Sequence, residues 1–117
     1  MVRARATPDA GDLVWLDFDP AAGREQAGRR PAIVLSPAAY NRKTSLAVVA
    51  PVTTHSKGYP FEVALPPNSK IRGVVLCDHL KSIDWQQRRA EYADTAPEQV
   101  MVEMREKLGV LLGVGDK

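Results

Sequence analysis

The segment from Gly23 to Pro31, GREQAGRRP, concentrates side chains that can act on a phosphodiester. Glu25 is suited to act as a general base, and Arg30 can bind two phosphate oxygens at once through its planar guanidinium. Thr53, at the end of a later apolar segment, can donate its hydroxyl to the same phosphate. Cleavage of RNA without a metal needs a base, a cation for the transition state and a proton for the leaving oxygen. A Glu–Arg–Thr set is of the right type and needs neither metal nor thiol.

The same residues also have a purely structural interpretation. Glu25 and Arg30 could form a loop salt bridge worth about 0–1 kcal/mol at a surface. Thr53 could be an ordinary strand residue. The residue types alone therefore leave both interpretations open.

Two other chemistries are compatible with parts of the sequence. Asp17 and Asp19 lie two apart on a predicted strand and share a face, but two carboxylates without further ligands favour a polar face over a metal site. His55 and His79 could act as the base and acid of a two-histidine ribonuclease. The single cysteine, Cys77, lies in an apolar run and is predicted to be a core residue.

Two strands are predicted to hold the reactive segment. Residues 11–18, GDLVWLDF, alternate so that one face is continuously apolar, and Asp19-Pro20 ends the strand. Residues 32–35 form an apolar run typical of a buried strand. The connection is longer than the roughly two to five residues that a hairpin needs, which favours a loop that presents functional groups on a rigid scaffold.

The rest of the chain predicts more short strands and a final helix. A helical turn with Ser36 as its cap is expected over 36–41. Thr95 and Glu98 have the spacing of a capping box, and apolar residues then recur at helical spacing until Gly113. Strands are expected at 46–53, 61–65, 73–77 and 88–92, and the helical stripe consists of Val100, Met104, Leu108 and Leu111. This order predicts a mainly β fold, a partly open antiparallel barrel with a C-terminal amphipathic helix.

Composition limits the classes of protein. The 117 residues are 44% hydrophobic, which fits one globular domain over 9–117 after a flexible basic tail at 1–8. The net charge is only +2, but arginines cluster in the loop and at 88–89, as in surfaces that meet phosphates. No leader or apolar run of about 20 residues is apparent, so we expect a cytoplasmic protein. With one cysteine and no paired histidines to form a zinc site, we expect neither cofactor nor metal.

Several segments together resemble one family. GDLVWLDFDP, GREQAGRRPAIVLSP and PVTTHSKGYPFEV are similar, in this order, to the MazF/PemK toxin endoribonucleases, and the resemblance runs from about Asp9 to about Gly113. It implies an SH3-like barrel of the CcdB/MazF type, usually a homodimer. It also implies sequence-specific, metal-independent cleavage of single-stranded RNA, as in mRNA interferases, with a 2′,3′-cyclic phosphate and a 5′-hydroxyl as products. A cognate MazE-like antitoxin with an acidic tail is implied as the partner.

The resemblance assigns roles to individual residues. Glu25, Arg30 and Thr53 match positions implicated in catalysis across the family. The chain has His79 where family members usually carry glutamine. The residues expected to contact RNA are Arg24, Gln26, Arg29, Lys57, Tyr59, Asp78, Lys81 and Arg88, and Trp15 is a further candidate for stacking on bases.

Two other functions fit a fold of this kind. One is a non-enzymatic toxin like CcdB, which blocks DNA gyrase. The other is an SH3-like module that binds peptide or nucleic acid. The segment GREQAGRR favours the ribonuclease, because a gyrase blocker has no need of a base beside an arginine.

Overall fold

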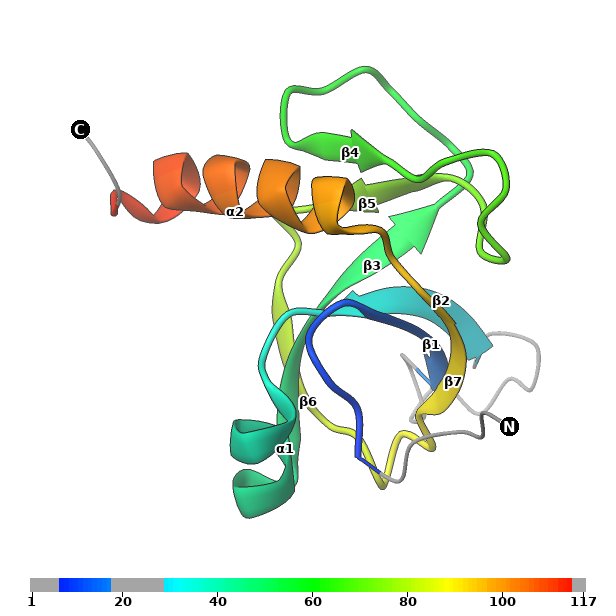
Figure 1. The fold of residues 1–117 in the computed structure, drawn as a ribbon, viewed down its shortest axis with the longest axis vertical. Coiled ribbons are helices and arrows are strands. Elements are labelled where there is room, and N and C mark those ends of the chain that lie inside the picture. The colour runs from blue at the N-terminus through cyan, green and yellow to red at the C-terminus, as the bar shows by residue number, and fades with distance from the viewer. Residues whose placement is uncertain (1–6, 18–28, 115–117) are drawn as a thin grey trace.

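Within residues 7–17 and 29–114, which the computed structural model describes, seven antiparallel strands form one bent, open sheet with two helices (Figure 1). The elements are β1 (Asp12–Asp17), β2 (Arg29–Val34), α1 (Ala38–Thr44), β3 (Leu46–Thr53), β4 (Glu62–Ala64), β5 (Val74–Leu76), β6 (Lys81–Asp84), β7 (Glu91–Thr95) and α2 (Glu98–Leu112). The sheet order is β4-β5-β3-β2-β1-β7, and β6 pairs with β3. The predicted mainly β fold with a C-terminal helix is confirmed.

β3 is the strand that joins the two parts of the sheet. Along one edge it pairs with β2, from Val49 to Pro51. Along the other edge its first half pairs with β6 and its last two residues, Val52 and Thr53, pair with β5. Because β6 and β5 share one edge of one strand, the sheet bends and opens two surfaces for packing (Figure 1).

The two faces of the sheet bury separate apolar clusters, because side chains alternate along each strand. Leu13 of β1 belongs to one cluster and its neighbour Val14 to the other. The larger cluster includes Ile33, Ala50, Val63, Val75, Cys77, Val100, Met101 and Met104, and the smaller one includes Leu16, Ala32, Val34, Ala47, Val49 and Ile83. β1 is therefore apolar on both faces, more than the one continuous face that its sequence predicts.

The cysteine is part of this core. Cys77 is fully buried, and this desolvation raises the pKa of its thiol to about 11. The prediction of a core cysteine is confirmed. No helix in the described part of the chain is long and apolar enough to cross a membrane.

The predicted helical turn is longer than expected and is capped differently. Pro37 occupies the N-cap of α1 without a side-chain cap. The Ser36 hydroxyl instead donates to Asn41 Oδ1 at 2.6 Å and accepts the Val48 N–H at 2.9 Å. Asn41 is buried, and its amide donates to the carbonyl of Pro8 at 2.8 Å. Most of the predicted basic tail, residues 1–8, lies outside the described residues, but Pro8 is packed against α1 by this bond.

α2 begins later than the sequence pattern predicts. The capping box of Thr95 and Glu98 is wrong, because Pro97 is the N-cap and no side chain caps it. The Thr95 hydroxyl bonds to the Tyr92 hydroxyl at 2.6 Å instead. Gly113 ends the helix with a φ of 70°, as predicted.

The apolar stripe of α2 packs against the core as far as Leu108. Val100, Met101 and Met104 are buried, whereas Leu111 is 40% exposed. In Figure 1 the last turns of the helix extend beyond β4 and β5, which explains why the end of the stripe stays uncovered.

The closing strand lies further along the chain than predicted. Residues 88–90 form turns in which Arg88 N–H donates to the Asp84 carbonyl and Ala90 N–H to the Trp85 carbonyl. β7 therefore starts at Glu91 and pairs with β1.

A cluster of ion pairs holds the end of β1. The Asp17 carboxylate accepts from Arg29 Nη1 at 3.2 Å and from Arg89 Nε at 3.0 Å. Arg29 also donates to the Arg89 carbonyl and pairs with Glu91 at 3.0 Å. The bond from Arg89, aided by Arg29, holds the pKa of Asp17 below its usual range despite some desolvation. Arg89 itself has a φ of 54°, an unusual conformation for a residue with a Cβ.

One glycine permits a close approach between β3 and the loop before β5. Gly73 has a φ of 121°, and a Cβ at this position would lie 2.1 Å from the Thr53 carbonyl oxygen. Any other residue would push the β4–β5 loop away from the end of β3.

We expect Gly73→Ala to lower the free energy of unfolding by at least about 2 kcal/mol more than Gly58→Ala. Gly58 also has a positive φ, of 74°, but a Cβ there would meet no atom within 4 Å, so it isolates the backbone cost from the steric clash. Urea unfolding of both variants measures the difference. Equal destabilisation would show that the contact with Thr53 does not constrain the fold.

We expect Asp17→Asn to destabilise the protein in a pH-dependent manner. Because the pKa of Asp17 is lowered in the folded state, its stabilising effect is complete above the pKa of the unfolded chain and is lost as the pH falls through the folded value. The difference in unfolding free energy between the native protein and Asp17→Asn should thus stay nearly constant from pH 7 to about pH 5 and shrink as the pH falls further. Glu106→Gln, on the exposed face of α2, is the control and should give a smaller difference at neutral pH. A pH-independent difference for Asp17→Asn would contradict this role.

Candidate functional site

Arg30 and Thr53 meet because their strands are neighbours. β2 and β3 pair with Ala32 opposite Pro51, and the same register continued by two residues brings Arg30 opposite Thr53. On its other side, Arg30 pairs with Leu16 of β1. A residue from the end of β2 and a residue from the end of β3 thus come to one corner of the sheet, although they are far apart in sequence.

A cavity of about 490 Å³ opens at this corner. Trp15, 37% exposed, forms part of its wall together with Arg30 and Thr53. The other residues that line it are Pro31, Val52, Thr54, His55, Lys70, Ile71 and Arg72. The cavity therefore combines an aromatic side chain, hydroxyls and several cations, which are the groups that bind nucleotides in single strands.

The hydroxyl of Thr53 is oriented by the chain that follows it. Its Oγ1 accepts the backbone N–H of His55 at 3.1 Å. Since the oxygen is the acceptor in this bond, the hydroxyl hydrogen remains available for donation to an oxygen in the cavity.

The loop after β3 is organised around one carboxylate. Glu62 accepts from the Ser56 hydroxyl at 2.7 Å, from the Lys57 N–H at 2.9 Å and from the Gly58 N–H at 3.1 Å. The Lys57 N–H and the Ser56 hydroxyl lower the pKa of Glu62. The side chains of Lys57 and Tyr59 remain exposed on this loop, Tyr59 to 60%, but neither lines the cavity.

Arg29 and Arg88 have structural partners. Arg29 is bound to Asp17 and Glu91, as described above. Arg88 Nη1 donates to the Asp17 carbonyl at 3.0 Å, and its own carbonyl accepts the Asp17 N–H at 2.9 Å. Their predicted contacts with RNA remain predictions, and any such contact would be made by side chains that already hold β1 in place.

Three further candidates lie away from the cavity. Lys81 is on β6 and pairs with Val49, near the middle of β3. Asp78 and His79 follow β5 at the end away from Thr53, with His79 Nε2 3.9 Å from Asp78 Oδ1. Of the two histidines, His55 alone is among the residues that line the cavity. The geometry thus does not favour the two-histidine interpretation.

Several predicted residues lie outside the described part of the chain. They are Arg24, Glu25 and Gln26 of the reactive segment, and Asp19 of the alternative metal site. Among the residues that are described, no group of three or more His, Cys, Asp or Glu side chains could hold a metal ion.

Lys70 and Arg72 are cavity residues that the sequence interpretation missed. They lie in the β4–β5 loop, for which the sequence predicted no site residue. The available signal was the pattern of two cations on either side of one apolar residue, followed by a glycine, in KIRG. This pattern indicates a loop held by its apolar residue with the cations facing outward.

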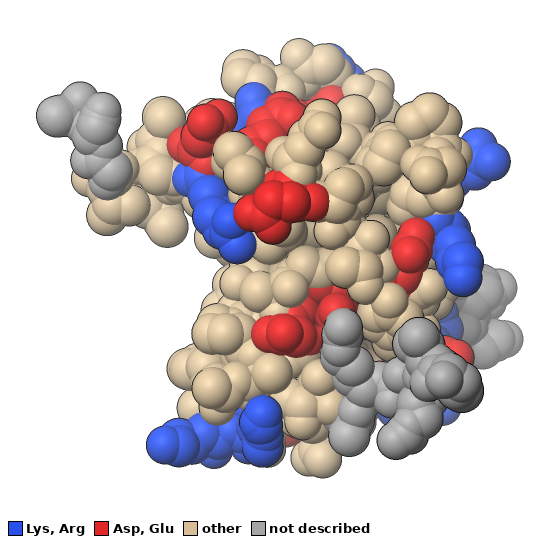
Figure 2. Space-filling view, viewed as in Figure 1, with Lys and Arg blue, Asp and Glu red and all other residues tan. Residues whose placement is uncertain are grey.

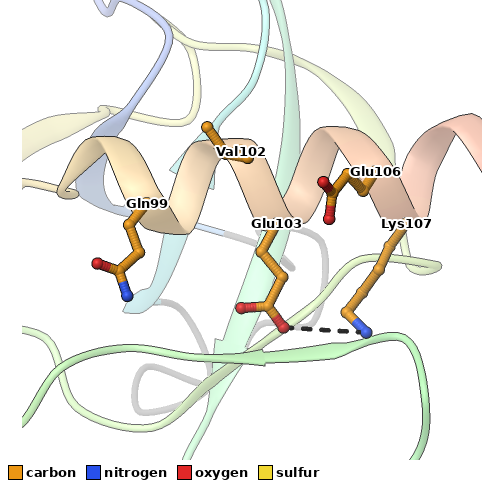
Figure 3. Close-up of a pocket in the computed structure, with 5 residues that line it drawn as sticks. All are labelled: Gln99, Val102, Glu103, Glu106 and Lys107. Carbon is orange, nitrogen blue, oxygen red and sulfur yellow. Dashed lines mark ion pairs between the residues drawn. The ribbon is translucent and has the colours of Figure 1, made fainter.

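A larger hollow of about 630 Å³ is lined by residues of α2, three of which, Gln99, Glu103 and Lys107, extend from the helix toward a neighbouring segment of the chain (Figure 3). Glu103 and Lys107 form an ion pair of 3.9 Å across it, and Gln99, Val102 and Glu106 complete the lining. Lys107 is also bound to the Pro60 carbonyl. Since its cation is neutralised and two carboxylates flank it, this hollow is a poorer site for a phosphate than the cavity at Arg30.

The comparisons with known proteins agree with the fold and the residues. Residues 9–112 match the family described as PemK-like, MazF-like toxin of type II toxin–antitoxin system. The chain is 51% identical over 111 residues to the endoribonuclease toxin MazF of Escherichia coli strain K12, covering 94% of this chain and 98% of that protein. It is 35% identical to the endoribonuclease PemK of Escherichia coli, covering 96% and 87%.

Solved structures give the same result. The structure of MazE–MazF from Deinococcus radiodurans superposes with a TM-score of 0.85 at 54% identity, covering 95% of this chain and 100% of that one. The structure of MazF from the same organism gives a TM-score of 0.84 at 59% identity, covering 94% and 100%. With a family match over nearly all of its length and relatives of this identity, the chain belongs to the PemK-like, MazF-like toxins of type II toxin–antitoxin systems.

Proposed function

We propose that this chain is a sequence-selective endoribonuclease that cleaves single-stranded RNA without a metal, as the toxin of a toxin–antitoxin pair. The observation that carries the proposal is the meeting of Arg30 and Thr53 at one cavity. Within the described residues Arg30 has no ion-pair partner, unlike Arg29 beside it. The names of the relatives, endoribonuclease MazF and endoribonuclease PemK, support the same activity.

In the proposed reaction Arg30 binds the scissile phosphate and stabilises the charge that develops on it. Thr53 donates its free hydroxyl hydrogen to a phosphate oxygen. Glu25, proposed from the sequence alone, takes the proton from the 2′-hydroxyl, whose oxygen then attacks phosphorus. The 5′-oxygen leaves and takes a proton from water, and the protonated Glu25 returns its own proton to the solvent, so the products are a 2′,3′-cyclic phosphate and a 5′-hydroxyl.

The residues around the cavity support binding of unpaired bases. Trp15 in its wall and the exposed Tyr59 on the loop after β3 can stack on bases, and Lys57 on that loop can meet a phosphate. Single-stranded RNA is bound in this way, because its bases are free to stack and to present their edges. We propose mRNA in the cytoplasm as the substrate.

The proposed protein partners are an antitoxin and a second copy of the chain. The structure of MazE–MazF from Deinococcus radiodurans supports an antitoxin of the MazE type. An acidic, partly disordered tail would be complementary to the cations at the cavity. Apolar side chains exposed at the end of α2, Val110 at 75% and Leu112 at 60%, support contact with another protein surface.

The proposed function is tested by digestion of a long, mixed-sequence single-stranded RNA in excess chelator. Discrete cuts at one short motif, leaving 5′-hydroxyl ends, are expected. A toxin like CcdB or a simple binding module would leave the RNA intact. Absence of cutting by a folded, antitoxin-free preparation would therefore refute the proposal.

We expect Arg30→Ala to lower the rate of cleavage by about 10²–10³-fold or more, because it removes a preorganised cation from the transition state. Arg30→Lys should recover only part of the activity, since lysine cannot bind two oxygens in a fixed plane. Arg42→Ala on α1, an exposed arginine far from the cavity, is the matched control and should cleave normally. Normal turnover by a folded Arg30→Ala variant would show that Arg30 is not catalytic.

Thr53 gives a finer test of the same site. Thr53→Ser keeps the hydroxyl and should stay within a few-fold of the native rate, whereas the isosteric Thr53→Val should cleave about 10²-fold more slowly. Steady-state cleavage of an oligonucleotide that contains the mapped motif measures both. Equal rates for the two variants would remove the hydroxyl from the mechanism.

A further inference from the structure

The β4–β5 loop adds two cations to the cavity of Arg30 and Thr53. Lys70 and Arg72 both line it. Both side chains are exposed, and Ile71 between them is only 2% exposed and belongs to the main core cluster. The buried residue fixes the loop, so its two charged neighbours are presented from a rigid base.

Two hydrogen bonds also hold this loop in place, one to β7 and one across the β4–β5 hairpin. The Lys70 N–H donates to Asp94 Oδ2 at 3.0 Å, and the Leu65 N–H donates to the Gly73 carbonyl at 3.0 Å. Gly73 packs against the Thr53 carbonyl so closely that no side chain would fit. Arg72, the residue before Gly73, is therefore held beside Thr53.

The charges of Lys70 and Arg72 are available to a ligand. Across residues 7–17 and 29–114, neither side chain takes part in a hydrogen bond or an ion pair. Asp94 is the acidic residue that binds this loop, and its carboxylate already accepts the backbone N–H groups of Lys70 and Thr95. The charge of Lys70 also contributes to the lowered pKa of Asp94, but the two side chains do not form an ion pair. By contrast, the side chains of Arg29, Arg88 and Arg89 at the end of β1 bind carboxylates or carbonyls. The cavity thus brings together three cations, Arg30, Lys70 and Arg72, none of which forms an ion pair with a side chain described in the structure.

Another pair of exposed neighbouring cations offers a comparison. Arg42 and Lys43 lie in the last turn of α1. Figure 1 places α1 at the opposite end from the β4–β5 loop, and Figure 2 shows Lys and Arg gathered there, at the lower left. This pair has the same charge as Lys70 and Arg72 but does not line the cavity, so it serves as a matched control.

We propose that Lys70 and Arg72 bind the phosphate next to the scissile phosphate of single-stranded RNA. This inference rests on the proposed function, because it places Arg30 and Thr53 at the scissile phosphate. A volume of about 490 Å³ is within the range of small-ligand sites and accommodates a nucleotide between the two phosphates. Trp15 in the same wall offers a stacking surface for its base, which favours a nucleic acid over an acidic peptide.

Phosphate binding by these residues predicts a change in salt dependence. The double variant Lys70→Gln/Arg72→Gln is compared with Arg42→Gln/Lys43→Gln in the full-length chain. The probe is a labelled single-stranded DNA of about 12 nucleotides of mixed sequence, which has the same phosphates but no 2′-hydroxyl and is not cleaved. Fluorescence anisotropy over a range of salt concentrations gives the affinity and its slope against log salt.

We expect the Lys70/Arg72 variant to bind the DNA at least about tenfold more weakly at low salt, with the salt slope reduced by about 0.7, the change for one phosphate that is no longer neutralised. The control should keep the slope of the native protein. The single variant Arg72→Lys should bind the DNA more tightly than the double variant, since it keeps the charge at this position. A native-like slope for the Lys70/Arg72 variant, or absence of DNA binding by the native protein at low salt, would overturn the inference.

Cleavage separates this inference from the proposed function. Because the pair binds a phosphate that does not react, the variant should raise KM severalfold and change kcat by less than about threefold. If the native protein cleaves but the variant has native KM and DNA affinity, only the inference fails. If the native protein does not cleave, the proposed function fails, and so does the assignment next to a scissile phosphate. If the variant instead keeps DNA binding but loses binding to an acidic peptide such as oligoglutamate, the loop is a protein-docking surface and the inference is overturned.

Discussion

The pairing of β3 with three other strands is the constraint on which the rest of the structure depends. One edge of β3 is hydrogen-bonded to β2, and the other edge is hydrogen-bonded to both β6 and β5. A shift of β3 by one residue would therefore exchange the side chains on its two faces. The end of β3 then has a fixed position opposite Arg30 and against Gly73. The candidate site is therefore a consequence of sheet register more than of any single loop.

Charge is divided between support and binding. Arg29 and Arg89 are bound to Asp17, and Arg88 is bound to the backbone of the same residue, so these arginines hold the end of β1 in place. Arg30, next to Arg29 in the sequence, faces the cavity instead, because alternate residues of a strand point to opposite sides. Two adjacent arginines thus acquire different tasks from strand geometry alone.

Much of the fold was predictable because local patterns and tertiary packing agree. The strand at 46–53, the alternation of Phe61, Val63 and Leu65, and the end of α2 at Gly113 all match the sequence pattern. The errors came where two local solutions compete. Thr95 could cap a helix or bond to Tyr92. In the structure its hydroxyl bonds to the Tyr92 hydroxyl of β7 and does not cap α2. The closing strand was misplaced because residues 88–90 are used in turns that only the partners Asp84 and Trp85 reveal.

The sequence by itself determined the family, the mainly β fold and Arg30 and Thr53 as candidates, because each is carried by a continuous stretch of residues whose types and spacing suffice. It contained the cations at 70 and 72, but nothing local distinguishes them from solvated residues in a turn. Only the tertiary structure decided that they face the cavity, since that depends on Ile71 entering the core and on Gly73 meeting the carbonyl of Thr53. The proximity of segments distant in sequence follows from strand order and packing, which no single stretch specifies.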